Sequence, residues 1–223
     1  MTTRAGTTAR STALILAMTL ALAPAVPARA QPAAAEVPAV PGPTACDFYA
    51  WTNNELPSIT LRAAPADDAP AIGTLPTTGA DDASETDDDY YSVGFQVTEA
   101  RDGWLHITGA NDDNSTKPRP VPAGSGWIRA SEARVGIQSA RGYARPDPAS
   151  ARLLDLGQDW LTERGAIRQI LACDGDWLLL DYALLVDRKF EPLPPSERVT
   201  RRAWFRGVCS VEETTCDMRS VDQ

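Results

Sequence analysis

Apolar and polar residues alternate in a series of short runs through the first half of the chain, and residues typical of turns separate these runs. Such alternation is typical of β-strands that bury one face. The Asp102–Gly103 pair between two of the runs is a strong signal for a tight hairpin turn. The runs cover 59–62, 72–75, 93–97, 104–108 and 127–129. Five short strands without a long helical stripe predict a small β-barrel.

A second series of runs follows in the same order, at 143–146, 153–156, 166–171, 177–181 and 203–205. The spacing along the chain from Trp104 to Trp177, which each begin a run, nearly equals the spacing from Trp127 to Trp204. A nearly constant offset between two landmarks indicates an internal duplication. Chance alignment of two β-rich stretches is the alternative. The pattern therefore predicts an all-β chain with two small barrels in tandem.

Each series has a first strand that stops at a proline, a short apolar strand, an Asp-Gly turn before a Trp, and a late strand (Gly126-Trp127-Ile128 or Ala203-Trp204-Phe205). This order resembles the bacterial Src-homology-3-like (SH3-like) domain family over 57–137 and 141–208. The resemblance implies two SH3-like barrels, which we assign to 46–139 and 140–223. It also implies a binding role, toward cell-wall peptides, polysaccharide or a partner protein, without catalytic residues.

The second copy departs from the family pattern in two places. It has no Gly before Trp204, and Pro192, Pro194 and Pro195 lie between residues 186 and 200, where a short hairpin is expected. These departures leave the strand register of the second copy open.

The N-terminus has the features of a secretory signal peptide, predicted over 1–30. Arg4 and Arg10 precede an apolar stretch at 12–26, and Ala28-Arg29-Ala30 fits the small-x-small cleavage rule. A membrane anchor and a lipoprotein attached through Cys46 are the alternatives that this pattern argues against. Residues 31–45, rich in Ala and Pro, are expected to form a disordered linker. We therefore expect a periplasmic or secreted protein with no membrane span in the mature chain.

Export places the four cysteines in an oxidising compartment, which favours two disulfides. Cys209 and Cys216 are close in sequence, and the segment between them can fold back as a loop, so we pair them. By subtraction Cys46 pairs with Cys173, which would tie the N-terminal arm to the second barrel. The chain has no Cys-x-x-Cys pair, which argues against a zinc site.

The formal net charge is −9, and a nucleic-acid-binding protein normally carries a basic face, so nucleic acid is not an expected partner. Residues 31–223 contain 18 Lys and Arg and 30 Asp and Glu, which gives a net charge of −12. The predicted first domain carries −9 of this and the second −2. Six carboxylates lie between 81 and 89, without the Gly and the ligand spacing of a calcium loop. We interpret them as a solvated loop, with an acidic contact surface for a basic partner as the alternative.

Aromatic side chains are the best candidates for ligand contact, because their amphipathic rings suit peptides and sugars. Trp104 is predicted to lie on the outer face of its strand, near the acidic loop. Trp177 is its counterpart, whereas Trp127 and Trp204 are expected to fill small cores. His106, the one histidine, has no nucleophile motif beside it, and we predict no catalytic residue, metal or cofactor. The predicted contact residues are Tyr90, Tyr91, Asp88, Trp104 and Trp177.

These features predict a non-enzymatic exported binding module for a cell-envelope ligand, a peptidoglycan peptide or glycan, or for a protein partner. The acidic first domain motivates an alternative, an inhibitor or immunity-type protein that binds a basic secreted enzyme. A wall hydrolase would need a catalytic domain of its own, and the two barrels leave no length for one.

Overall fold

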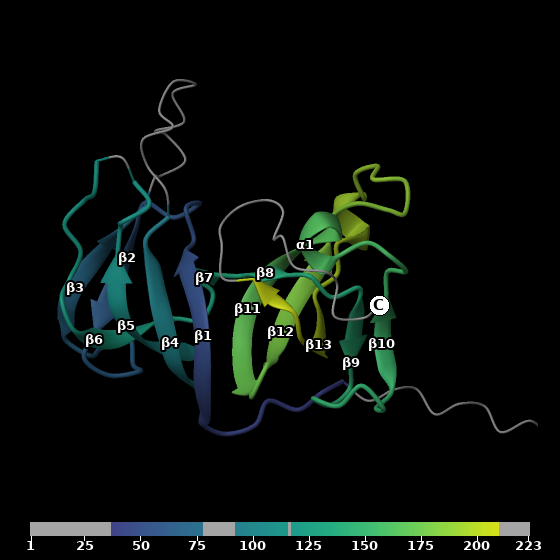
Figure 1. The fold of residues 1–223 in the computed structure, drawn as a ribbon, viewed down its shortest axis with the longest axis horizontal. Helices are drawn as coiled ribbons and strands as arrows, with labels where there is room; N and C mark the ends of the chain where they lie inside the picture. Colours follow the sequence, from purple (N-terminus) through teal and green to yellow (C-terminus); the bar gives the residue numbers. More distant parts are fainter. Residues whose placement is uncertain (1–36, 78–91, 116, 210–223) are drawn as a thin grey trace, which may run out of the picture. The chain divides into compact units, whose positions relative to one another are not determined.

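The computed structural model describes residues 37–77, 92–115 and 117–209, which belong to one compact unit that spans 35–223. The predicted signal peptide at 1–30 lies outside these residues. Within them the chain is built almost entirely of β-strands (Figure 1). The helical segments described are one short helix, α1 (Leu161–Arg164), and one 3-10 turn (Pro195–Glu197). The predicted all-β class is confirmed.

The first sheet has seven strands in the order β3-β2-β6-β5-β4-β1-β7, and neighbouring strands are antiparallel. Its strands are β1 (Thr44–Thr52), β2 (Ser58–Arg62), β3 (Ala71–Pro76), β4 (Gly94–Arg101), β5 (Trp104–Asn111), β6 (Ser125–Arg129) and β7 (Ala133–Arg134). Each alternating run predicted in this half overlaps one strand. The β4–β5 turn confirms the hairpin signal, because Asp102 and Gly103 both have positive φ, at 49° and 81°.

The second sheet has five strands in the order β10-β9-β13-β12-β11. Its strands are β9 (Arg141–Tyr143), β10 (Arg152–Asp155), β11 (Gly165–Asp174), β12 (Trp177–Leu184) and β13 (Arg201–Phe205). Two short strands, β8 (Gly136–Ile137) and β14 (Val208–Cys209), pair with each other. The order β10-β9-β13-β12-β11 repeats the order β3-β2-β6-β5-β4 of the first sheet, strand for strand.

The likeness of the two sheets extends to their irregularities. The β4–β5 pairing shifts register between Gly94 and Gln96 and again between Val97 and Glu99. The β11–β12 pairing shifts between 167 and 169 and between 170 and 172, which are the same positions counted back from the tryptophan that begins the next strand. A β-bulge bends its strand at a specific point. The two hairpins therefore share the same register and the same bends.

β1 has no counterpart in the second sheet, and it begins at Thr44, inside the predicted linker of 31–45. It pairs with β4 on one side and β7 on the other. Phe48, Ala50 and Thr52 are buried, and the residues between them are half-buried. β1 therefore extends the first sheet toward the second, and it packs against β11.

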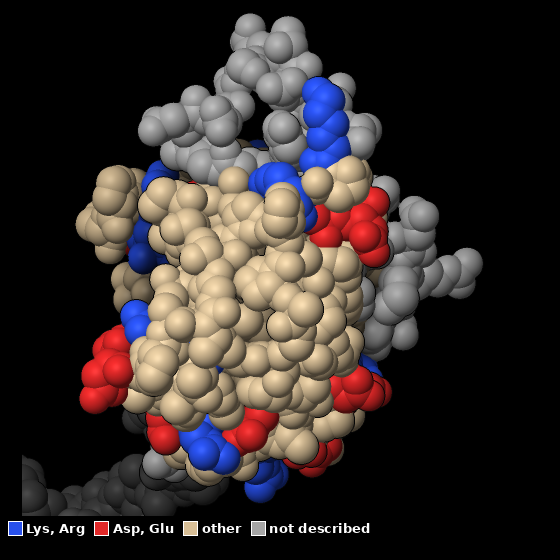
Figure 2. All heavy atoms as spheres, turned by 90° about the vertical axis from the view of Figure 1, so that its left-hand side faces the viewer, with Lys and Arg blue, Asp and Glu red and all other residues tan. Residues whose placement is uncertain are grey.

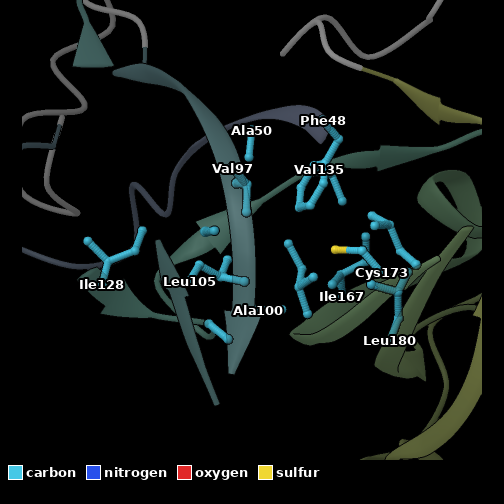
Figure 3. Close-up of a cluster of buried hydrophobic side chains, with 14 of the residues drawn as sticks. Phe48, Ala50, Val97, Ala100, Leu105, Ile128, Val135, Ile167, Cys173 and Leu180 are labelled. Atoms are coloured by element: carbon cyan, nitrogen blue, oxygen red, sulfur yellow. The ribbon is translucent and has the colours of Figure 1, made fainter. Parts of the chain in front are cut away.

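One hydrophobic cluster contains side chains from both sheets. Figure 3 shows Phe48, Val97 and Ala100 of the first sheet beside Ile167 and Leu180 of the second. The contact between the sheets is reinforced at β11. There the Cys173 amide donates to Thr44 Oγ1 at 3.0 Å, and the Ile170 amide to the Ala130 carbonyl at 3.5 Å.

The predicted Cys46–Cys173 disulfide is confirmed. It joins β1 to β11 across 127 residues of sequence, with 5.3 Å between the two Cα atoms. Cys209 is also held in a disulfide. Its predicted partner, Cys216, lies outside the described residues. In the part of the chain that the structure describes, no helix is long and apolar enough to cross a membrane.

Candidate functional site

The two faces of β5 separate its side chains into two groups. Leu105 and Ile107 belong to the hydrophobic core, whereas Trp104, His106 and Thr108 point the other way. Cross-strand pairing places Trp104 opposite Arg129 and Arg101, and His106 opposite Trp127. We call this group the first outer face; it consists of Arg101, Trp104, His106, Trp127 and Arg129.

Two arginines cover the tryptophans of the first outer face. The Arg129 guanidinium carbon lies 4.5 Å from the centre of the Trp104 ring, and that of Arg101 lies 5.6 Å from the Trp127 ring. Both distances fall within the range of cation–π attraction. Trp104 is 5% exposed as a result. Trp104 thus lies on the outer face of its strand, as expected, but its ring is covered, and its role in ligand contact stays a prediction.

Acidic groups hold Arg129 in this position. Its guanidinium forms a salt bridge with Asp67, and its backbone amide donates to Glu132 Oε2 at 2.7 Å. Burial raises the pKa of the Glu132 carboxyl, and the bond from Arg129 only partly offsets this. Arg101 is in turn paired with Glu99 at 2.5 Å. The cations on the tryptophans are thus fixed parts of the face.

His106 is half-buried on the first outer face. Its Nδ1 lies 2.7 Å from Thr98 Oγ1, and its ring centre lies 5.1 Å from that of Trp127. Across the described ranges no three His, Cys, Asp or Glu side chains gather closely enough to hold a metal ion. The chemistry that this face offers is therefore aromatic stacking and hydrogen bonding from arginine.

The second sheet carries a matching group, which we call the second outer face; it consists of Tyr143, Trp177, Leu179, Trp204 and Arg206. The Arg206 guanidinium carbon lies 5.6 Å from the Trp177 ring, and Tyr143 meets that ring edge-on at 5.4 Å. Trp177 is half-buried and therefore more open than Trp104. Trp204 is buried in a small cluster of its own, which agrees with the prediction that it fills a core.

The tryptophan–arginine pairs occupy equivalent positions in the two sheets. Trp104 and Trp177 each begin the second strand of a hairpin, and Arg129 and Arg206 each stand two positions after the tryptophan of a late strand. The two central positions differ, because Leu179 stands where the first face has His106. The second outer face is therefore less polar than the first.

The remaining predicted contact residues are not brought to either face by the described structure. Asp88, Tyr90 and Tyr91 lie outside the described residues, and so does the acidic segment at 81–89. Trp127, expected to fill a small core, is buried at 9% exposed, and on the first outer face its ring lies against His106. The arginines were not among the predicted contact residues. A Trp-x-Arg spacing shared by Trp127-Ile128-Arg129 and Trp204-Phe205-Arg206 is the signal that marks them.

Charge is distributed unevenly over the surface. Figure 2 shows the side of the molecule on which β2, β3 and β6 lie, with uncharged side chains across its centre and charged ones around its rim. Ile72 of β3 is 50% exposed. A neutral face on a chain of net charge −9 gives a basic partner little reason to dock on this side.

No family model and no curated protein matches the chain.

Proposed function

We propose that the protein is a non-enzymatic, exported binding module built from two SH3-like units, and that its ligand is a cell-wall peptide or glycan. The observation that carries the proposal is the repeat of strand order, hairpin register and bulge positions between the two sheets. Two copies of one five-stranded unit account for most of the described strands. Such an arrangement suits two weak contacts on one polymer, which gain affinity from each other.

The outer faces supply the contact chemistry in this proposal. Trp177 is half-buried, and its ring lies against Tyr143 and under Arg206. Aromatic rings stack on the apolar faces of sugars and peptides, and a guanidinium donates several hydrogen bonds to hydroxyl or carbonyl oxygens. We assign the more open Trp177 to ligand contact, and we assign Trp104, which Arg129 covers, to the stability of the first sheet.

The test is co-sedimentation of the purified, oxidised protein with purified cell wall. We expect retention on the wall and a loss of affinity of about fivefold in Trp177→Ala. Phe190→Ala is the matched control, because Phe190 is an aromatic residue of the β12–β13 connection that is 52% exposed, lies against Arg164 and belongs to neither outer face. Equal retention of Trp177→Ala and the native protein would show that the second outer face is not the contact.

The acidic composition favours the second candidate, an inhibitor or immunity-type protein for a basic secreted enzyme. A pull-down from an envelope extract at increasing salt separates the two. A basic protein that is retained at low salt and released at high salt supports the inhibitor. Retention of wall polymer that resists salt supports the wall ligand, and retention of neither rejects the binding module.

A further inference from the structure

A cavity of about 560 Å³ opens between β10 and the start of β13. β13 pairs with β9 at one register, Trp204 with Tyr143, so the strands separate beyond this point. Leu153 of β10 lines one side of the cavity, and 200–202 line the other. A volume in this range is typical of sites for small ligands. The cavity lies on the second sheet and includes none of the residues of the outer faces.

The wall of the cavity carries a hydroxyl group that the fold does not use. Tyr182 lines it and is 1% exposed, and its ring packs edge-on against Phe205 at 5.2 Å. Among the described residues its hydroxyl has no hydrogen-bond partner. It is not one of the fully buried side-chain atoms that lack a partner in the described structure, so it lies at the surface of the cavity. A hydroxyl left open at a cavity wall is therefore available to a ligand.

The charged side chains around the cavity favour a ligand with one negatively charged group. Arg202 is engaged with Asp181 through two hydrogen bonds, from Nε to Oδ1 at 2.8 Å and from a terminal nitrogen to Oδ2 at 3.0 Å. Arg201 is exposed, and within the described part of the chain it forms no ion pair. One positive charge thus remains uncompensated at the cavity. A guanidinium binds a carboxylate through two parallel hydrogen bonds.

A second cavity lies on the other side of Arg201, and comparison of the two linings shows which side suits a carboxylate. It measures about 410 Å³, shares Arg201, and is lined by Leu184, Leu193, Ser196, Glu197 and Val199. Glu197 repels an anion there, whereas the Tyr182 side offers a hydroxyl donor. The rest of the lining on the Tyr182 side includes the apolar Leu153 and Val37.

We propose that this cavity binds a carboxylate that carries an aliphatic side chain. Arg201 and the Tyr182 hydroxyl donate to the carboxylate, and Leu153 and Val37 contact the aliphatic group. Either a free N-acylated amino acid or the C-terminal residue of a peptide has this chemistry. The site is separate from the outer faces and does not depend on the proposed wall ligand.

The test is titration of the oxidised protein with N-acetyl-leucine, followed by calorimetry or by ligand-observed NMR. We expect saturable binding with a dissociation constant of about 1 mM, typical of a ligand of this size. N-acetyl-leucinamide, which lacks the carboxylate, is expected to bind at least about tenfold more weakly. Equal binding of the acid and the amide, or no saturable binding of the acid, would overturn the proposal.

Three variants locate the site. Arg201→Gln is expected to weaken N-acetyl-leucine about tenfold, and Tyr182→Phe, which keeps the ring and removes the hydroxyl, about threefold. Arg168→Gln is the matched control, because Arg168 is an exposed arginine on β11 outside the cavity. This variant should bind N-acetyl-leucine as tightly as the native protein does. If Tyr182→Phe fails to fold, the Arg201→Gln variant still tests the site, because Arg201 is exposed. Unchanged affinity for N-acetyl-leucine in Arg201→Gln would reject the site.

The source of the carboxylate is decided by comparing N-acetyl-leucine with N-acetyl-alanyl-alanyl-leucine. Tighter binding of the tripeptide identifies a peptide C-terminus as the ligand, and equal binding identifies the single residue. Failure of both titrations would leave retention on cell wall unaffected, so the two proposals fail separately.

Discussion

Arginine decides the exposure of the aromatic residues in this protein. Trp104 faces away from the core, as the alternation in its strand predicts, yet the Arg129 guanidinium covers its ring. Alternation along one strand shows which face a residue occupies. It does not show which side chain of the neighbouring strand lies over it, because that depends on register. The exposure of the aromatic side chains depends on cross-strand pairs, and it was therefore the property of the candidate site that the sequence could not predict.

Replacing the two equivalent tryptophans should have unequal effects on stability. Trp104→Ala removes a buried ring and should lower the free energy of unfolding by about 3 kcal/mol. Trp177→Ala removes a half-buried ring and should cost about 1 kcal/mol. Denaturant unfolding of both variants checks this. Each of the two tryptophans has an arginine over its ring. Equal losses of unfolding free energy would mean that this contact matters more than the difference in exposure between the two rings.

Asp112 is the centre of a second residue-scale interaction. Its carboxylate accepts hydrogen bonds from the Arg119 backbone amide at 2.7 Å, from two Arg119 side-chain nitrogens at 2.8 Å each, and from Ser115 Oγ at 2.8 Å. Burial acts to raise the pKa of Asp112, but the bonds from Arg119 and Ser115 outweigh it, and the pKa is lowered. The carboxylate fixes the chain after β5.

Ionisation of Asp112 should make the free energy of unfolding depend on pH in the acidic range. A lowered folded pKa means that the stabilisation is complete above the unfolded value of about 3.9 and is lost as pH falls through the folded value. Asp112→Asn should therefore lose about 2 kcal/mol at pH 7, and its difference in stability from the native protein should narrow as the pH falls below about 4. Unfolding free energies measured across this range test the prediction. A gap that stays constant would assign the loss to packing.

At the scale of elements, the apolar runs and their repeat located every strand of the two repeated units but not β1. In β4 and β5 one face lies in the core and the other is less buried, so their sequences alternate, whereas β12 was found by its parallel to β5. β1 lies between β4 and β7 and packs against β11, so residues on both of its faces are at least half-buried between Phe48 and Thr52. A strand covered on both sides loses its alternation.

The link between β1 and β11 should contribute strongly to stability. The Cys46–Cys173 disulfide closes a span of 127 residues, which restricts the unfolded chain and is worth about 5 kcal/mol in the chain-entropy account. The double variant Cys46→Ser, Cys173→Ser should lose stability on that scale, as measured by denaturant unfolding under oxidising conditions. A loss below about 1 kcal/mol would mean that the packing of β1 on β11 already holds the sheets together.

For the whole molecule, the duplication was visible in the sequence because the tryptophans keep the same places in the two series of strands. The meeting of the two sheets in one hydrophobic cluster was not visible, because local patterns identify apolar faces without showing which faces meet. The Cys46–Cys173 pairing was the one long-range contact that the sequence predicted. It followed from the cysteine count, since the other pair was assigned by its short spacing.

The shared cluster gives a test of the predicted domains, 46–139 and 140–223. If Phe48, Val97 and Ala100 need Ile167 and Leu180 as neighbours, each half expressed alone should lose cooperative unfolding or several kcal/mol of stability. The control is the intact chain cleaved between 139 and 140, in which the disulfide keeps the halves together. Two halves that each unfold cooperatively at native stability would establish independent domains.

The position of the disulfide also decides how the molecule responds to a pulling force between its two ends. Tension enters through Cys46 and leaves through Cys173, so the strands between them carry no load while the bond is intact. At about 3.6 Å for each extended residue, the bond shields about 450 Å of chain from extension. Under tension at both ends, the segment between the two cysteines would therefore not extend until a reductant reaches that bond, whereas β12, β13 and β14, which follow Cys173, are not shielded. Single-molecule stretching with and without reductant measures this difference directly.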